Sequence, residues 1–140
     1  MIFNRIKQGL LYIFGKYSEE NDKIVEEILS KEEFEIFNSM IEYDKIHSFR
    51  LLEFVRENTL LRENKLYWKL ALLHDCGKGK ATLLRRIKKV IAGDKKLEEH
   101  TEKGYSKLKD INMPLALLCR QHHDNTSNPE MKEFQKLDDR

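Results

Sequence analysis

Apolar residues recur at helical spacing along most of this sequence, and very little in it would interrupt a helix. Only two prolines occur, Pro114 and Pro129, and the β-branched residues stand singly and do not alternate with polar ones. Alternation of apolar and polar residues is typical of a half-buried strand, so its absence argues against a sheet. The sequence therefore predicts an all-α protein, folded as a compact helical bundle.

Several helix ends can be placed from the residues that favour them. Ser30 followed by Glu33 forms a capping-box pattern, which predicts a helix that starts here and extends toward His47. Gly77 lies where a helix should stop. Further helices are expected over residues 49–58, 65–75, 81–91, 97–108, 114–123 and 129 to the end.

Length and composition predict one domain. A chain of 140 residues with 40% hydrophobic content is enough for a single modest core. We expect residues 1–140 to form this domain, with 1–28 as an N-terminal helical extension. Lys and Arg total 26 against 24 Asp and Glu, a net charge of +2, which gives no global reason to expect nucleic acid or an anionic membrane as partner. The two cysteines, Cys76 and Cys119, are too few for a secreted disulfide framework, so a reducing cytoplasm is expected.

The N-terminal segment 1–17 is both basic and apolar. Its longest uninterrupted apolar run covers only residues 10–14, so neither a signal peptide nor a membrane span is expected. Its apolar residues recur at helical spacing, which favours a short amphipathic helix docked on the core over a membrane-surface anchor.

A second basic segment lies between residues 80 and 96. Its cationic residues are Lys80, Arg85, Arg86, Lys88, Lys89, Lys95 and Lys96. Such a run is usually the solvated face of a helix, although it would also attract polyanionic substrates such as nucleotides if it lay beside a pocket. No aromatic residues interleave with these charges and no DNA-binding motif is recognisable, so a stable nucleic-acid partner is not expected.

Histidines and their neighbours carry the functional argument. Five are present, each at a helix end or beside another potential ligand: His47, His74, His100, His122 and His123. Imidazole nitrogen and carboxylate oxygen are the ligands that borderline divalent metals prefer. His74 and Asp75 point about 100° apart on a helix, so both reach one cation only near the helix end, where Gly77 lets the chain turn away. A lone His-Asp pair is more often a surface or capping feature, so the doublet alone does not identify a site.

Read in order, these residues resemble the HD-domain superfamily of metal-dependent phosphohydrolases. That family's pattern is a histidine, a His-Asp doublet followed by a small apolar residue, Gly and Lys, one or two further histidines and a final aspartate, carried on a helical bundle. Here the elements are His47, HDCGK at 74–78, His100 in HTEKG, His122 and His123 in CRQHHD, and Asp138 in LDDR. The resemblance runs from about residue 29 to the last residue, and LSKEEFEIFNSMIEYDKIHS looks like the lead-in of small bacterial members.

The sequence departs from the family pattern at a few positions. Cys76 stands where the family often has isoleucine, and a structural role is expected for this small thiol. Leu137 precedes the last aspartate where family members often carry alanine. Asp138 is followed by only two residues and could lie on a frayed turn, so Asp139 is the alternative ligand. No GYP-type signature follows the double histidine, which argues against the cyclic-di-GMP phosphodiesterase branch.

The resemblance implies a divalent metal cofactor of one or two ions, with Mn, Fe, Co, Ni or Zn favoured over Mg. The implied ligands are His47, His74, Asp75, His100, His122, His123 and Asp138. One ion would be held by His47, His74, Asp75 and Asp138. A second would be held by His100 and His122, with Asp75 bridging. His123 would be a ligand, a proton donor to the leaving group, or a solvent-facing neighbour. If His100 faces away from the pocket, the site holds one metal.

The implied reaction is hydrolysis of a phosphoester or phosphoanhydride by a metal-activated water. A bound cation lowers the pKa of water from about 15.7 toward about 7 and polarises a phosphoryl oxygen. The predicted catalytic residues are Asp75, Lys78 and His123. Lys78 could stabilise charge on a substrate phosphate, and the simpler interpretation is a solvated lysine.

A small phosphorylated molecule, by resemblance a nucleotide, is the expected substrate. The alternative is a non-catalytic module on the same fold that senses a nucleotide or metal. The complete ligand set favours the enzyme, because a site without a catalytic role should tolerate the loss of at least one ligand. The oligomeric state has no sequence signal.

Overall fold

The computed structural model describes residues 17–79 and 97–140. These two ranges contain helices α2 (Asn21–Ile28), α3 (Lys31–Asn38), α4 (Glu42–Glu57), α5 (Lys65–Leu73), η1 (Cys76–Lys78), α7 (Leu97–Leu108), α8 (Met113–Gln121) and α9 (Pro129–Asp138). No strand occurs in these ranges, and the prediction of an all-α protein is confirmed. The helices expected within 1–17 and over 81–91, and the basic segment 80–96, lie outside the described residues. No helix in the described part of the chain has the length and apolarity needed to cross a membrane.

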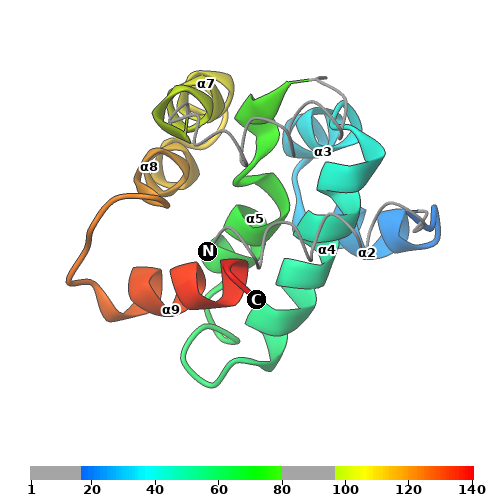
Figure 1. Cartoon of the computed structure of the whole chain (residues 1–140). Helices are drawn as coiled ribbons and strands as arrows, with labels where there is room; N and C mark the ends of the chain where they lie inside the picture. Colours follow the sequence, from blue (N-terminus) through cyan, green and yellow to red (C-terminus); the bar gives the residue numbers. More distant parts are fainter. Residues whose placement is uncertain (1–16, 80–96) are drawn as a thin grey trace.

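Helix α5 lies at the centre of the bundle (Figure 1). It packs against α4, α8, α2 and α3, while α9 packs against α4. The run Leu70–Leu73 is fully buried, as expected for a helical turn that is apolar on all sides. Large side chains fixed around it include Phe37, Leu51, Leu52, Leu115 and Phe134, all of them fully buried. The polar residues that follow Leu73 are therefore held at the centre of the molecule.

The capping box at the start of α3 forms as predicted. The Ser30 hydroxyl accepts a hydrogen bond from the Glu33 amide at 3.2 Å, and the Glu33 carboxylate accepts one from the Ser30 amide at 2.7 Å. That carboxylate is buried and also accepts from Lys69 Nζ and Asn112 Nδ2, each at 2.9 Å. Burial raises the pKa of Glu33, but the bonds from Lys69, Ser30 and Asn112 outweigh burial and hold it below its usual value. Glu33 thus joins α3 to α5 and to the start of α8.

The predicted extension of this helix toward His47 is wrong, because a corner separates α3 from α4. The Ser39 hydroxyl donates to the Ile36 carbonyl at 2.7 Å, and Ile41 is extended, with φ −68° and ψ 156°, before α4 begins. Helix α4 then runs without a break through position 48, where a boundary was expected. Neither Gly nor Pro marks the corner, so apolar periodicity alone does not reveal it.

Other predicted ends differ by one or two residues. Helix α5 ends at Leu73, before the doublet, and α8 covers Met113–Gln121 where 114–123 was expected. His74 and His122 therefore occupy the C-cap positions of these two helices. Both histidines lie where the backbone leaves the helical path, a place from which neighbouring side chains can converge.

Glycines bring α7 directly onto η1. A Cβ at Gly77 would collide with the His100 carbonyl oxygen and lie 2.6 Å from the Gly104 amide nitrogen. A Cβ at Gly104 would lie 2.6 Å from Cys119 Sγ. Gly77 was expected to let the chain turn; its absence of a side chain serves instead for close approach, and among the described glycines Gly79 has the positive φ, 74°. The contact places His100 beside Asp75.

Candidate metal centre

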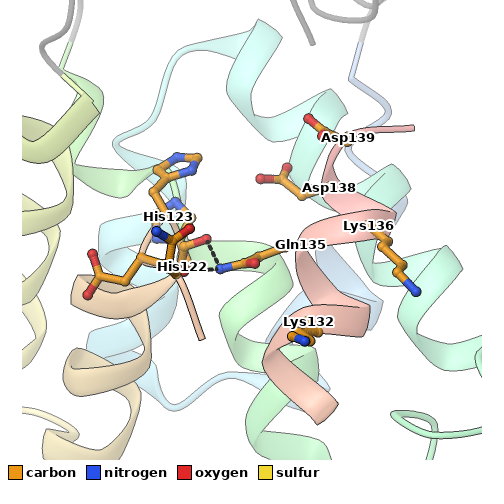
Figure 2. A pocket seen from close by; sticks show the side chains of 9 residues that line it. His122, His123, Lys132, Gln135, Lys136, Asp138 and Asp139 are labelled. Carbon is orange, nitrogen blue, oxygen red and sulfur yellow. Dashed lines mark hydrogen bonds between the residues drawn. The ribbon is translucent and has the colours of Figure 1, made fainter. Parts of the chain in front are cut away.

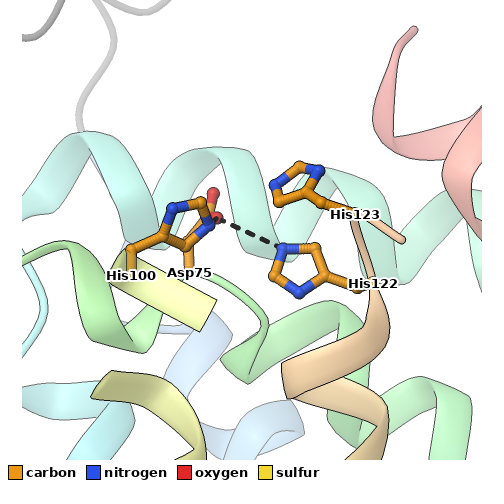
Figure 3. A group of neighbouring side chains, drawn as sticks. All are labelled: Asp75, His100, His122 and His123. Atoms are coloured by element: carbon orange, nitrogen blue, oxygen red, sulfur yellow. Dashed lines mark ion pairs between the residues drawn. The ribbon is translucent and has the colours of Figure 1, made fainter. Parts of the chain in front are cut away.

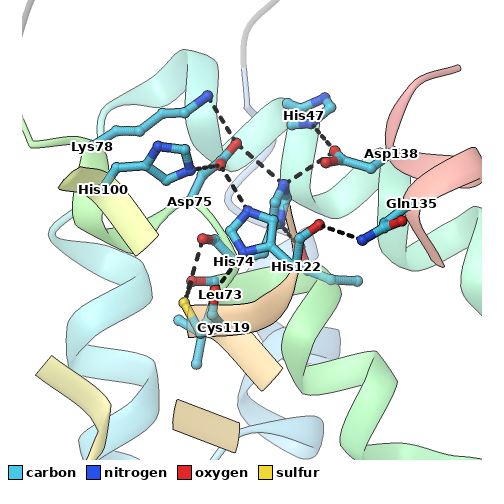
Figure 4. Close-up of polar contacts among 11 residues, drawn as sticks. His47, Leu73, His74, Asp75, Lys78, His100, Cys119, His122, Gln135 and Asp138 are labelled. Carbon is cyan, nitrogen blue, oxygen red and sulfur yellow. Dashed lines mark hydrogen bonds and ion pairs between the residues drawn. The ribbon is translucent and has the colours of Figure 1, made fainter. Parts of the chain in front are cut away.

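Five segments bring their polar side chains together at the inner ends of the helices (Figure 4). The cluster contains all the predicted ligands: His47 on α4, His74 and Asp75 after α5, His100 on α7, His122 and His123 after α8, and Asp138 on α9. His74, Asp75, His100 and His122 are buried, and the apolar core lies next to them.

The first group of contacts is centred on His74. Its Nε2 lies 3.2 Å from Asp75 Oδ2 and 3.2 Å from Asp138 Oδ1. His47 Nε2 lies 3.0 Å from the same Asp138 oxygen. One ligand atom each from His47, His74 and Asp75 falls within 4.8 Å of the others, close enough to surround a single ion.

The second group lies on the other side of Asp75 (Figure 3). Asp75 Oδ1 is 3.5 Å from His100 Nε2 and 4.0 Å from His122 Nε2. With His123, these residues offer four ligand atoms that all lie within 4.8 Å of one another. The two Asp75 oxygens therefore face different groups of histidines, which is the geometry of a bridging carboxylate.

Hydrogen bonds orient the imidazole rings. Nδ1 of His74 lies 2.9 Å from the Ala71 carbonyl, and Nδ1 of His122 lies 2.5 Å from the Cys119 carbonyl. A carbonyl only accepts, so a hydrogen sits on Nδ1 of each ring and Nε2 points into the cluster, as in metal-binding histidines. In the described part of the chain, the buried Nε2 atoms of His74, His100 and His122 lie near carboxylate oxygens but make no hydrogen bond. Buried polar atoms are normally satisfied, and a divalent cation between these nitrogens and oxygens would satisfy them.

The charges of the cluster favour a cation. Burial lowers the pKa of His74, but the Asp75 and Asp138 carboxylates outweigh it and raise that pKa well above its ordinary value. Burial raises the pKa of Asp75, but His74 and Lys78 hold it well below the usual range, and Asp138 is lowered likewise by His74. Burial keeps the pKa of His122 well below its ordinary value, so this imidazole is neutral and able to bind metal. The site thus holds ionised carboxylates around a position that attracts positive charge.

Lys78 faces the cluster. Its Nζ lies 3.2 Å from Asp75 Oδ2, and its side chain is 20% exposed. The interpretation as a purely solvated lysine does not fit this contact. Cys76, by contrast, is a free and buried thiol that belongs to neither group of ligand atoms. Its side chain fills space beneath Gly104, in agreement with the structural role expected for it.

A cavity of about 510 Å³ opens beside the cluster (Figure 2). It is lined by His122, His123, Asp124, Asn125, Lys132, Gln135, Lys136, Asp138 and Asp139. Its volume falls within the range of small-molecule sites, and its wall includes three of the predicted ligands. Sequence reasoning missed Gln135, which donates to two backbone carbonyls after α8; a polar residue on an amphipathic helix gave no signal for this.

A helical bundle with such a centre belongs to the class of proteins able to hold divalent cations through histidine and aspartate. The family model of the HD domain matches residues 45–139, and the chain belongs to the HD-domain family. The match begins in α4 and ends after α9, so it includes every residue of the cluster. Proteins of this superfamily are generally metal-dependent phosphohydrolases. No curated protein and no solved structure matches the chain significantly.

Proposed function

We propose that the protein hydrolyses a phosphoester or phosphoanhydride of a nucleotide-type substrate with the help of one or two divalent metal ions. The observation that carries this proposal is Asp75, whose two oxygens face two separate groups of histidine nitrogens. A structural histidine cluster would have no need of buried nitrogens that make no hydrogen bond.

The residues divide into two ligand groups. His47, His74 and Asp138 would hold one ion, and His100 and His122 the second, with Asp75 between them. His123 completes the second group or faces the cavity as a proton donor. The imidazole-rich set favours Mn, Fe, Co, Ni or Zn over Mg, which prefers oxygen ligands. Such ions, when bound, supply a nucleophilic hydroxide at neutral pH and polarise a phosphoryl oxygen.

Two features of the protein support a phosphorylated substrate. Lys78 places an ammonium group 3.2 Å from the bridging carboxylate, where it would also contact an oxygen of the transferring phosphoryl group and stabilise its charge. The adjoining cavity provides room for the remainder of the substrate, and the ammonium group of Lys132 on its wall is a second positive charge besides Lys78. His123 lines the same cavity and would deliver a proton to the departing oxygen.

The test combines metal analysis with turnover. Protein loaded with Mn²⁺ should hydrolyse a generic phosphodiester or a member of a nucleotide panel, and Asp75→Asn should lose both activity and metal. Asp110→Asn is the matched control, because Asp110 is exposed on the turn after α7. An Asp75→Asn variant that keeps wild-type metal content and hydrolysis would overturn the assignment. Metal binding without turnover of any panel member would identify the sensing module instead.

A further inference from the structure

The two ligand groups depend on different neighbours for their positions. Asp138, in the first group, lies on α9, while His122 and His123, in the second group, follow the end of α8. The loop between these helices covers residues 122–128, and α9 leaves in a different direction from α8 (Figure 1). The relative placement of the two groups therefore requires a connection between α9 and the end of α8.

Gln135 makes that connection (Figures 2 and 4). It lies on α9 one turn before Asp138, and its Nε2 donates to the His122 carbonyl at 3.2 Å and to the Asp124 carbonyl at 2.8 Å. The last carbonyls of a helix have no partner within the helix, so this amide supplies one. Because the His122 ring is already held by the Cys119 carbonyl, both its backbone and its ring are fixed.

Helix α9 is anchored without Gln135. Asn58 Nδ2 donates to Glu133 Oε1 at 3.0 Å, and Asn64 Nδ2 donates to Glu130 Oε2 at 2.8 Å. Phe134, next to Gln135, is fully buried in the core. Removing the Gln135 amide should therefore leave Asp138 in place and release mainly the backbone that carries His122.

We propose that Gln135 is a positioning residue that fixes His122 and His123 for the second ion, an inference that rests on the proposed metal-dependent function. Groups that orient metal ligands typically contribute a factor of 10–100 in metal affinity. The affinity for the ion of the second group should decrease, and the affinity for the ion held beside His47 and His74 should not change.

The experiment compares Gln135→Met with the wild type in Mn²⁺ titrations followed by calorimetry. Methionine keeps the length of the side chain and a high helix propensity but has no N–H donor. Gln121→Met is the matched control, since Gln121 is exposed at the end of α8. In Gln135→Met, we expect the affinity for the ion of the second group to fall roughly 10–100-fold and the affinity for the ion of the first group to stay unchanged. In Gln121→Met, both affinities should equal those of the wild type. Thermal unfolding of the metal-free proteins is measured alongside.

Each outcome separates this inference from the proposed function. A wild type that binds no Mn²⁺ would contradict the proposed function itself. A wild type that binds Mn²⁺ with affinities unchanged in Gln135→Met would overturn the role of Gln135 and leave the metal centre standing. Equal weakening of both ions, with a large fall in the unfolding temperature of the metal-free variant, would show a merely structural role and also overturn the inference.

Discussion

Replacing Glu33 by glutamine should destabilise the protein while leaving the residues of the candidate metal centre in place. The carboxylate is 1% exposed and accepts hydrogen bonds from Ser30, Lys69 and Asn112 at 2.7–2.9 Å. Glutamine has the same shape, but it places an N–H₂ group where one carboxylate oxygen accepted a bond. The Asn112 amide cannot readily adapt, because its own oxygen accepts from the Leu115 amide at 3.2 Å.

The expected loss follows from these contacts. A hydrogen bond to a charged group contributes about 1.5–3 kcal/mol, and glutamine removes one such bond and weakens the other two. We therefore expect the free energy of unfolding to fall by about 2–3 kcal/mol. At roughly 3–5 °C per kcal/mol for a chain of this size, the midpoint of thermal unfolding should fall by roughly 6–15 °C. Urea titration followed by circular dichroism measures the first quantity, and a thermal scan the second.

The effect of Glu33→Gln should depend on pH in a defined direction. The folded state lowers the pKa of Glu33, so ionised Glu33 stabilises the fold fully above the unfolded pKa of about 4.3. This stabilisation is lost as the pH falls through the lower folded value, and the difference between wild type and variant should shrink there. Glu35→Gln, on the exposed face of α3, is the control. A loss below about 0.5 kcal/mol, or one that persists unchanged at acid pH, would refute the reasoning.

Three further changes probe the contacts around the site. Gly104→Ala should cost about 1–3 kcal/mol, measured by urea unfolding, because its Cβ would lie 2.6 Å from Cys119 Sγ; stability equal to wild type would contradict the close approach of α7. His47→Ala should weaken the first ion in a Mn²⁺ titration while circular dichroism stays helical; unchanged affinity would exclude His47 as a ligand. Replacing His100 and His122 together by alanine should lower bound metal from about two ions per chain to about one by elemental analysis, and retention of two would contradict their assignment.

Apolar periodicity predicts most of this fold because each helix must bury one face. It predicts α5, α7, α8 and α9 to within two residues and the end of α4 to within one, and Ser30 marks the start of α3, but the start of α4 is missed. The corner at Ser39–Ile41 escapes prediction because it depends on a hydroxyl-to-carbonyl bond and an extended residue, neither of which needs a distinctive amino acid. Local sequence thus predicts the helices better than the corners between them.

The candidate site can be predicted in part from the sequence, for a different reason. Histidine and aspartate are chemically distinctive, so their order along the chain indicates a metal centre before any coordinates are known. The division of the two Asp75 oxygens between two groups is a property of the tertiary structure, as is the contact of Lys78 with that carboxylate. Gln135 acts through its reach to backbone carbonyls, and a glutamine elsewhere on the surface looks the same in sequence.

The contact between His47 and Asp138 joins residues 91 positions apart. Contacts of such large separation require the closure of a long loop, which costs chain entropy and slows folding. During synthesis, His47 leaves the ribosome long before Asp138, so a nascent chain can present the histidines of α4 and α5 without the carboxylate that completes their group. Binding of a cation that depends on Asp138 would therefore have to follow the synthesis of α9.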